Sequence, residues 1–288
     1  MAEIMSNIIS AIIHLVKNPQ IELIRKGSSR NRANTMGEAL EEYIKDLFAN
    51  TLGVADEQTR NVAIAQTFSY LGNQNNPPDS MLRGGDAIEV KKIESRNAAL
   101  ALNSSYPKAK LFAHSPMIKK ACRDCEPWTQ KDMIYAVGVV NGNRLESLAF
   151  VYGEDYCADK ETYETIKSTI KNGVESIPNV EFAESKELGH VNRVDPLGIT
   201  YLRIRGMWGI ENPFTVFDYV YQRNPRNTFN FMCIINNDKF HSFENASELI
   251  ALSKQNKNLS IQDVQIKNPN NPAQLRGAKC IAFGIEAQ

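Results

Sequence analysis

The sequence PPDSMLRGGDAIEVKK, residues 77–92, has the form of two strands joined by a turn at a glycine pair. Its second half alternates apolar and charged residues, as a half-buried strand does. Successive side chains of a strand point to opposite faces, so Glu89 and Lys91 share one face while Ile88 and Val90 point into the core. The stretch therefore predicts a rigid strand that holds a carboxylate and an ammonium group side by side.

Asp79, on the strand before the turn, joins this face in only one kind of register. A two-residue glycine turn would place Asp79 opposite Val90, on the wrong face. A three-residue loop at 84–86 sets Asp79 opposite Lys91 instead. We expect this odd loop or an equivalent bulge. Asp86 then lies in the turn or on the other face, and is the weaker candidate for a ligand.

Hydrophobic periodicity predicts the elements around this hairpin. Helices are expected at 4–17, 35–48, 115–125, 159–177 and 244–254, and strands at 61–72, 133–140, 145–152, 199–208 and 229–235. Thr35 and Glu38 have the spacing of a capping box for the second helix. The order predicts an α/β protein with a mixed central sheet flanked by helices in residues 1–155. Residues 156–288 are expected to form an appended α+β region, packed with this core as one globular unit.

Length and composition define the broad class of the protein. A chain of 288 residues with 42% hydrophobic and 23% charged residues can bury a sizeable core. The apolar run at 8–16 is too short to span a membrane, and five cysteines fit a reducing cytosol. The formal net charge is zero, yet basic residues concentrate in 25–32 and 83–123 and acidic residues in 154–187. This asymmetry indicates either one basic face for a polyanion or solvated faces that cancel.

Two carboxylates and a lysine on one rigid face suit the hydrolysis of a phosphodiester. Carboxylate oxygens bind Mg²⁺ in sites that keep waters and accept phosphate oxygens, and the metal activates a water for attack. A lysine orients or deprotonates that water and offsets developing negative charge. The pattern here, Pro78-Asp79 followed by Glu89-Val90-Lys91, resembles the PD-(D/E)xK nuclease superfamily. That resemblance implies Asp79 and Glu89 as Mg²⁺ ligands and a PD-(D/E)xK core.

The helix at 35–48 supplies a further candidate ligand. PD-(D/E)xK nucleases often place a glutamate from their first core helix at the metal site. Glu41 lies at the edge of the buried stripe of this helix, and we assign it to the site as a third metal ligand. The alternative is a surface glutamate paired with Lys45 one turn later.

Four longer runs resemble one family within that superfamily. They are RNRANTMGEALEEYIKDLF (30–48), FSYLGNQNNPPDSMLRGGDAIEVKKIES (68–95), ALALNSSYPKAKL (99–111) and YLRIRGMWGIENP (201–213), which together look like the NgoPII family of type II restriction endonucleases. The resemblance implies Mg²⁺-dependent cleavage of double-stranded DNA at the palindrome GGCC, leaving 5′-phosphate ends. It further implies a cytoplasmic homodimer, without membrane association, in a bacterium whose partner methyltransferase protects its own sites.

A site made only of G·C pairs is best recognised by arginine, which donates two hydrogen bonds to guanine O6 and N7. Arg203 and Arg205 share one strand face and are expected to contact bases, with Trp208 and Asn212 in an irregular segment against the duplex. A solvated strand edge is the alternative for the two arginines. Phosphate contacts, which carry no sequence information, are assigned to Arg30, Arg32, Asn103, Ser104, Ser105 and Lys108.

Two other readings of the active-site pattern stay open. A structure-specific or repair nuclease could use the same core, although the region after residue 190 offers the surface that sequence recognition needs. A DNA-binding module without catalysis is disfavoured, because two acids would repel a phosphate. Cys122 and Cys125 have zinc-like spacing, with His114 and Cys157 as further ligands, yet we expect two thiols on a short helix.

Overall fold

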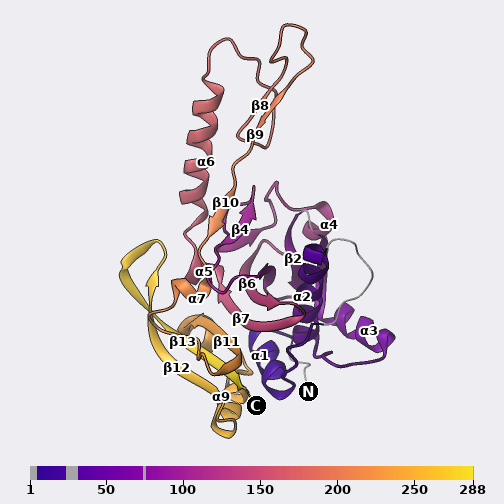
Figure 1. Cartoon of the computed structure of the whole chain (residues 1–288), viewed down its shortest axis with the longest axis vertical. Coiled ribbons are helices and arrows are strands. Elements are labelled where there is room, and N and C mark those ends of the chain that lie inside the picture. Colours follow the sequence, from indigo (N-terminus) through magenta and orange to yellow (C-terminus); the bar gives the residue numbers. More distant parts are fainter. Residues whose placement is uncertain (1–4, 24–31, 74–75, 288) are drawn as a thin grey trace.

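One large mixed sheet runs through the body of the protein (Figure 1). The structure, a computed structural model, describes residues 5–23, 32–73 and 76–287. Within these ranges the sheet has nine strands in the order β1-β2-β3-β6-β7-β11-β13-β12, with β5 beside β6. β3 is parallel to β6 and β7 is parallel to β11, while the other pairs are antiparallel. The C-terminal strands thus continue the sheet that the N-terminal strands begin.

The strands of this sheet are β1 (Phe68–Asn73), β2 (Asn76–Leu82), β3 (Ala87–Ile93), β5 (Lys110–Phe112), β6 (Gln130–Asn141), β7 (Arg144–Tyr152), β11 (Asn227–Asn236), β12 (Leu259–Asn268) and β13 (Asn271–Glu286). Two small sheets pair β4 (Leu100–Asn103) with β10 (Trp208–Ile210), and β8 (Gly189–Val191) with β9 (Leu202–Ile204). The helices are α1 (Ile8–Lys17), α2 (Arg32–Ala49), α3 (Glu57–Thr67), α4 (Lys120–Arg123), α5 (Gly153–Tyr156), α6 (Lys160–Glu175), α7 (Pro213–Val216), α8 (Asn237–His241) and α9 (Ala246–Gln255).

Apolar side chains cover both faces of the central sheet. On one face α1, α2 and α9 bury their apolar sides against the strands. Leu40 of α2 fills the space above Gly138 of β6, where an added Cβ would lie 2.7 Å from Leu40 Cδ2. On the other face α4, α7, β4 and β10 cover the sheet. Among the described helices, none is long and apolar enough to cross a membrane.

Several predicted elements are confirmed. The apolar runs around Asn-Gly-Asn form the antiparallel hairpin of β6 and β7, with Gly142 at φ 66° in its turn. The helices expected at 159–177 and 244–254 are α6 and α9, and the strand at 229–235 lies within β11. Patterns of this kind are reliable here because a strand buried on both faces, or an amphipathic helix, leaves a long local signal.

Four predicted elements are wrong in type or extent. Residues 57–67 form helix α3, capped by the Asp56 side chain, and the strand begins only at Phe68. Helix α2 starts at Arg32, so Thr35 lies inside it rather than at its N-cap. The helix expected at 115–125 is reduced to α4, and the strand at 199–208 divides into β9 and β10 of different sheets. In each case tertiary packing, which local pattern does not report, sets the boundary.

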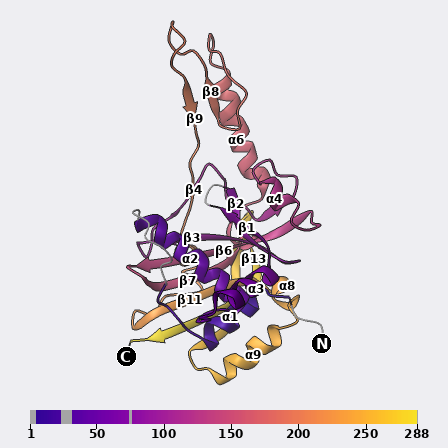
Figure 2. The same ribbon diagram turned by 90° about the vertical axis from the view of Figure 1, so that its right-hand side faces the viewer.

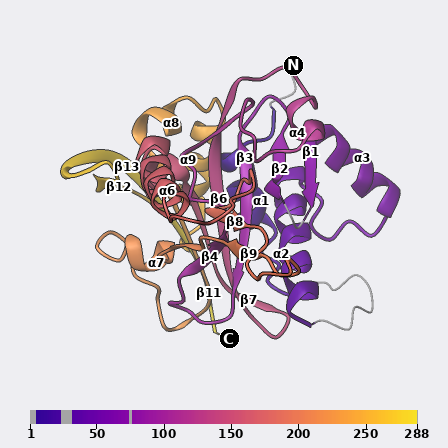
Figure 3. The ribbon, with the colours of Figure 1, turned by 90° about the horizontal axis from the view of Figure 1, so that it is seen from above.

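An arm projects from this body, formed by α6, β8, β9 and the connections between them, residues 160–205 (Figures 1 and 2). Figure 3 looks down the arm onto the sheet, so that α6 is seen end-on. No residue of α6 is buried. The loop between β8 and β9 exposes 82% of Leu197 and 76% of Ile199. The arm is therefore held by few contacts of its own chain and leaves apolar side chains uncovered.

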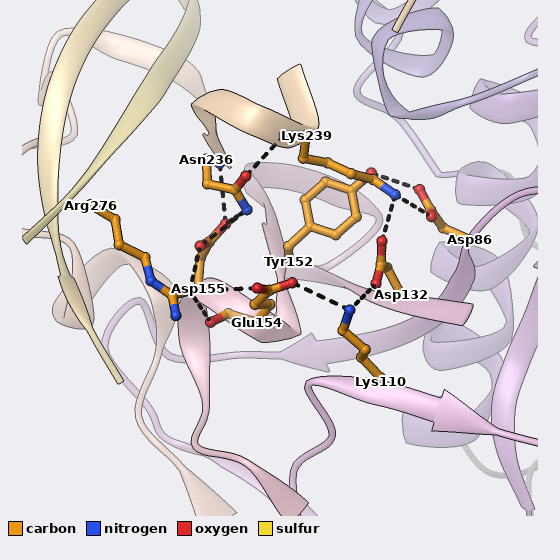
Figure 4. A network of polar contacts seen from close by, with 9 residues as sticks. All are labelled: Asp86, Lys110, Asp132, Tyr152, Glu154, Asp155, Asn236, Lys239 and Arg276. Carbon is orange, nitrogen blue, oxygen red and sulfur yellow. Dashed lines mark hydrogen bonds and ion pairs between the residues drawn. The ribbon is translucent and has the colours of Figure 1, made fainter. Parts of the chain in front are cut away.

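A polar network joins the start of β3 to the C-terminal part of the sheet (Figure 4). Lys239 of α8 donates to Asp86 Oδ1 at 2.8 Å and to Asp132 Oδ2 at 2.6 Å, and Tyr152 Oη donates to Asp86 Oδ2 at 2.6 Å. Asp86 is thus committed to this network, away from Glu89. Further members of the network are Lys110, Glu154, Asp155, Asn236 and Arg276. These charges tie α8 and β13 to β3, β5 and β6.

Replacing Lys239 tests how strongly the network holds the two parts together. We expect Lys239→Met to lower the free energy of unfolding by about 3–5 kcal/mol, because Asp86 and Asp132 would lose their shared cation in a largely buried place. Guanidinium denaturation measures the change.

Lys17→Met is the matched control, since Lys17 pairs with Glu248 at 2.9 Å with both side chains more than half exposed. Loss of this surface pair should cost no more than about 1 kcal/mol. Equal effects of the two substitutions would contradict a special role for the network.

Candidate active site

The β2–β3 hairpin places Asp79 on the face that carries Glu89 and Lys91. The two strands pair antiparallel around a three-residue loop at 83–85. The expected odd loop is therefore confirmed. The expected loop at 84–86 is wrong by one residue, and continuing the observed register puts Asp79 opposite Glu89 rather than Lys91. The reason is that the Leu82 N–H donates a hydrogen bond to the Asp86 carbonyl across the hairpin, so Asp86 belongs to the strand pair and lies outside the loop.

Asp79, Glu89 and Lys91 form a tight polar group on this face. Asp79 Oδ2 accepts a hydrogen bond of 2.6 Å from the backbone N–H of Val90. Lys91 Nζ donates to Glu89 Oε1 at 2.6 Å, and the two side chains are only 24% and 14% exposed. In the part of the chain that the structure describes, Glu89 Oε2 is buried without a hydrogen-bond partner. A buried, unsatisfied carboxylate oxygen is costly unless a further group binds it.

The charges of this group act strongly on one another. Burial, followed by the charge of Glu89, raises the pKa of Asp79 to about 8. Burial alone would lower the pKa of Lys91, but the charges of Glu89 and Asp79 outweigh it and hold that pKa above its ordinary value. Lys91 therefore stays a cation, whereas Asp79 keeps its proton until about pH 8 unless another positive charge lies beside it.

Glu41 of α2 lies within the electric field of this group. Burial raises the pKa of Glu41, Lys45 and Lys91 lower it, and Glu89 raises it further. No group of three or more His, Cys, Asp or Glu side chains among the described residues is close enough together to hold a metal ion. Glu41 therefore does not complete a three-carboxylate cage with Asp79 and Glu89 in this conformation. The alternative, an ion pair between Glu41 and Lys45, is not what the structure shows, because Lys45 pairs with Glu42 at 2.8 Å.

Arg203 and Arg205 lie together on the arm and are bound by one carboxylate. Glu187 accepts two hydrogen bonds from Arg203, at 2.9 and 2.6 Å, and one of 2.6 Å from Arg205 Nε. Both arginine side chains remain about half exposed. Since Arg203 and Arg205 alternate with Ile204, whose side chain faces Gly189, the two guanidinium groups point to the solvent face of β9.

Asn212 is the clearest error among the predicted DNA contacts. Its side chain is completely buried, donates to the carbonyl oxygens of Arg96 and Ala98, and accepts from Phe214 N–H as the N-cap of α7. A side chain with all of these bonds made inside the protein does not reach a duplex. Asn212 instead fixes the segment that follows β10. Its side chain caps the N-terminus of α7 and donates hydrogen bonds to two carbonyl groups of the chain between β3 and β4.

Trp208 and Asn103 are brought together by the pairing of β10 with β4, in which they face each other. Trp208 lies in a strand rather than in an irregular segment. It packs against Tyr106 and Tyr163, with ring centroids 6.1 and 5.6 Å apart. Asn103 has φ 52° and begins the exposed turn at 103–105. The predicted phosphate-contact loop and one predicted recognition residue thus form one surface.

The remaining predicted DNA contacts stand differently. Arg30 lies outside the described residues. Arg32 is the first residue of α2, and the position of its side chain is not described. Ser104 and Ser105 follow Asn103 in the turn, and Lys108 Nζ donates to Ser105 Oγ and, at 3.2 Å, to the Tyr106 carbonyl. Their contacts with DNA stay predictions.

The cysteine pair contacts neighbours of its own chain. Cys122 is buried in α4 and donates to Met81 Sδ at 3.4 Å, while Cys125 donates to the Cys122 carbonyl at 3.2 Å. Cys157 donates to the Gly153 carbonyl, and the His114 ring lies against Phe112. Cys122 and Cys125 are neighbours, although α4 includes only Cys122. Among the described residues they form no group with a third His, Cys, Asp or Glu that could hold a metal ion.

Two positions near the site escaped the sequence reasoning. Tyr135 of β6 stands in register with Glu89, is buried, and accepts the backbone N–H of Lys108 at 2.7 Å. Gly153 lets the chain at Lys108 approach closely, because an added Cβ would lie 2.1 Å from the Lys108 carbonyl oxygen. Neither leaves a local signal, since a tyrosine in an apolar strand and a glycine after one have many ordinary explanations.

The raised pKa of Asp79 predicts a pH-dependent cost to folding in metal-free buffer. The unfolded chain releases this proton near pH 4, whereas the folded chain keeps it until about pH 8, so stability falls across that window. We expect Asp79→Asn, which cannot ionise, to be increasingly more stable than the wild type from pH 5 to pH 8. The difference should exceed about 1 kcal/mol at pH 8.

Denaturation in EDTA at pH 5 and pH 8 measures this change. Asp263→Asn is the control, because the Asp263 side chain is 76% exposed and solvent screens its pair with Lys279. An Asp79→Asn variant that is less stable at pH 8 than at pH 5, relative to the wild type, would contradict the assignment.

Comparison with known proteins shows the family of the chain. The model of the family "NgoPII restriction endonuclease" matches residues 6–267. The type II restriction enzyme NgoPII of Neisseria gonorrhoeae is 58% identical over 280 residues, which is 97% of this chain and the full length of that enzyme. No solved structure matches significantly. The chain belongs to the NgoPII restriction endonuclease family.

Proposed function

We propose that this type II restriction enzyme hydrolyses both strands of double-stranded DNA within the palindrome GGCC, with Mg²⁺ as cofactor, and leaves 5′-phosphate ends. The observation that carries the proposal is the buried Glu89 oxygen without a partner, beside Asp79 and Lys91 on one strand face. We assign the fold of residues 1–155 to the PD-(D/E)xK core. The mixed sheet, the β2–β3 hairpin and α2 behind it support this assignment.

The residues present fit a magnesium ion. Mg²⁺ is commonly bound through one or two carboxylates, with waters and substrate phosphate oxygens completing the shell. Glu89 Oε2 and the Asp79 carboxylate would hold it, and Glu41, which lies in the field of Glu89, is proposed as the third ligand. When bound, the ion supplies Lewis-acid charge and lowers the pKa of a coordinated water.

Side chains and backbone groups of the protein would orient the attacking water and offset the negative charge of the phosphate. Glu89 holds the Lys91 ammonium at 2.6 Å, so that Lys91 can hydrogen-bond the attacking water or a phosphate oxygen. The water oxygen forms a bond to phosphorus and loses one proton to solvent, while the bond from phosphorus to O3′ breaks and O3′ takes up a proton from solvent to become the 3′-hydroxyl. The Val90 N–H keeps the Asp79 carboxylate in place during these steps.

Recognition is assigned to the region 156–288, above all to the arm. Arg203 and Arg205 are proposed to contact guanines, because both are half exposed and Glu187 already holds their guanidinium groups together. The turn at 103–105 and Trp208, which share one surface, would lie along the backbone. DNA must displace Glu187 from the arginines or share them with it.

A palindromic target asks for two-fold symmetry, so we propose a homodimer. The uncovered apolar side chains of the arm support an intermolecular contact there. The biological setting would be a bacterial cytoplasm, with a methyltransferase that acts on the same sequence as functional partner.

Digestion of a sequenced plasmid tests cleavage and its site together. With Mg²⁺ the wild type should give discrete fragments that end within GGCC, and none in EDTA. Glu89→Gln and Lys91→Met should lower the rate roughly 10³-fold or more, because they remove the ligand oxygen and the cation beside it. Gel analysis followed by sequencing of the ends measures both results.

Glu94→Gln, just after β3 and 73% exposed, is the control and should cut at the wild-type rate. Random nicking, or cutting of branched DNA alone, would favour a structure-specific nuclease. Retardation of DNA by a folded wild type that never cuts would favour a binding module.

Substitution of Arg203 tests base recognition. If Arg203 donates to guanine, Arg203→Ala should lower discrimination between GGCC and sites with one changed base pair by about tenfold or more at the pair it contacts. Values of kcat/KM on the cognate and changed duplexes measure this. Lys186→Ala, an exposed arm lysine, should weaken action on all duplexes alike. A uniform loss with Arg203→Ala as well would assign Arg203 to the phosphates.

A further inference from the structure

Lys108 is fixed beside the active site from two directions. Its backbone N–H donates to Tyr135 Oη at 2.7 Å, and Tyr135 stands in register with Glu89 on the neighbouring strand. On the other side its carbonyl lies against Gly153, where no side chain could fit. The position of Lys108 therefore depends on the same β3–β6 pairing that presents Glu89.

The side chain of Lys108 is half-buried, and its ammonium group has no carboxylate partner within 4.0 Å among the described residues. Its bonds run to Ser105 Oγ and the Tyr106 carbonyl, and it lies 5.2 Å from the centre of the Tyr106 ring. Burial lowers the pKa of Lys108, and the charge of Glu89 opposes that effect. A cation in such a place is costly unless an anion arrives to pair with it.

Lys108 and Glu89 border the same very small space, of about 10 Å³. A small pocket is lined by both residues, together with Ser105, Tyr106 and Tyr135. On its other side Lys108 lines a cavity of about 930 Å³ between the body and α6. Lys108 thus stands where this cavity meets the catalytic face.

Charge balance explains why a second cation is needed there. Asp79, Glu89 and Glu41 together repel a phosphate, and the charge of Lys91 is already offset by Glu89 at 2.6 Å. Lys108 is a neighbouring cation that forms no ion pair within 4.0 Å among the described residues, although the charge of Glu89 reaches it. Hydrolysis of a phosphodiester places further negative charge on the non-bridging oxygens, which a preorganised donor stabilises.

We propose that Lys108 is a second lysine of the catalytic centre, which leaves Ser105 and Tyr106 to donate a hydrogen bond to a non-bridging oxygen of the scissile phosphate. This role rests on the proposed nuclease function and differs from a contact with the flanking backbone, because it is specific for one phosphate. Lys91 remains the lysine paired with Glu89.

Binding in EDTA tests the contact without any cleavage. Once digestion has located the scissile linkage, a duplex with a neutral methylphosphonate at that linkage is compared with the unmodified duplex. The change in Kd caused by the methylphosphonate should differ by about tenfold between the wild type and Lys108→Met, because only the wild type has the cation that the phosphate charge attracts. A methylphosphonate three linkages away should show no such difference.

Lys167→Met is the matched control. Lys167 lines the same cavity from α6 but lies outside the pocket that contains Glu89. Lys167→Met should weaken binding of all duplexes and reduce the salt dependence of binding. The effect of the methylphosphonate at the scissile linkage should be the same in Lys167→Met as in the wild type. Equal methylphosphonate effects in the wild type and Lys108→Met would overturn the proposal.

Cleavage gives the second measurement. Lys108→Met should slow the single-turnover rate at saturating enzyme about 100-fold, and Lys108→Arg should recover part of that loss. Lys108→Arg keeps the charge and is the second variant if Lys108→Met does not fold. In Lys108→Arg the methylphosphonate should change Kd as much as it does in the wild type. A wild type that fails to cut refutes the proposed function. A cutting wild type with unchanged rate and coupling in the Lys108 variants refutes only this inference.

Discussion

The parallel pairing of β3 with β6 is the contact on which the rest of the site depends. It aligns Glu89 with Tyr135 and Lys91 with Val137, in the middle of a sheet that is covered on both faces. A slip of one residue would exchange the two faces of β3 and turn Ile88 and Val90 toward the polar side. Because that slip would bury charges among the helices, the hydrophobic core holds the catalytic face in place.

The site is stabilised from outside rather than by its own contacts. Asp79 and Glu89 are largely buried and would repel each other once both were ionised, and one oxygen of Glu89 has no partner among the described residues. Such an arrangement opposes folding until a cation binds. The network around Lys239 anchors the start of β3 at Asp86. The apolar packing of the sheet stabilises the remainder of the strand. In the proposed mechanism, the strand that carries these side chains is rigid, and bound cations balance its negative charge.

The arm contrasts with this rigid body. α6 buries none of its residues, and the β8–β9 loop exposes apolar side chains, so the arm has little packing of its own to lose when it meets another surface. Its arginines are held by Glu187 at the surface, where solvent weakens an ion pair. The residues proposed for catalysis and those proposed for recognition thus lie on parts that differ in packing. Lys108 lines the cavity between arm and body.

The sequence alone determined what depends on local backbone geometry. Alternation put Glu89 and Lys91 on one face, and the Asn-Gly-Asn turn joined β6 to β7, because strand pleat and turn chemistry act over a few residues. The family resemblance added the nature of the chemistry. Only the tertiary structure decided the register of Asp79, the burial of Asn212 and the contact of Lys108 with Tyr135. Each of these follows from contacts between segments far apart in the chain, whose energies depend on packing and leave no periodic trace in the sequence.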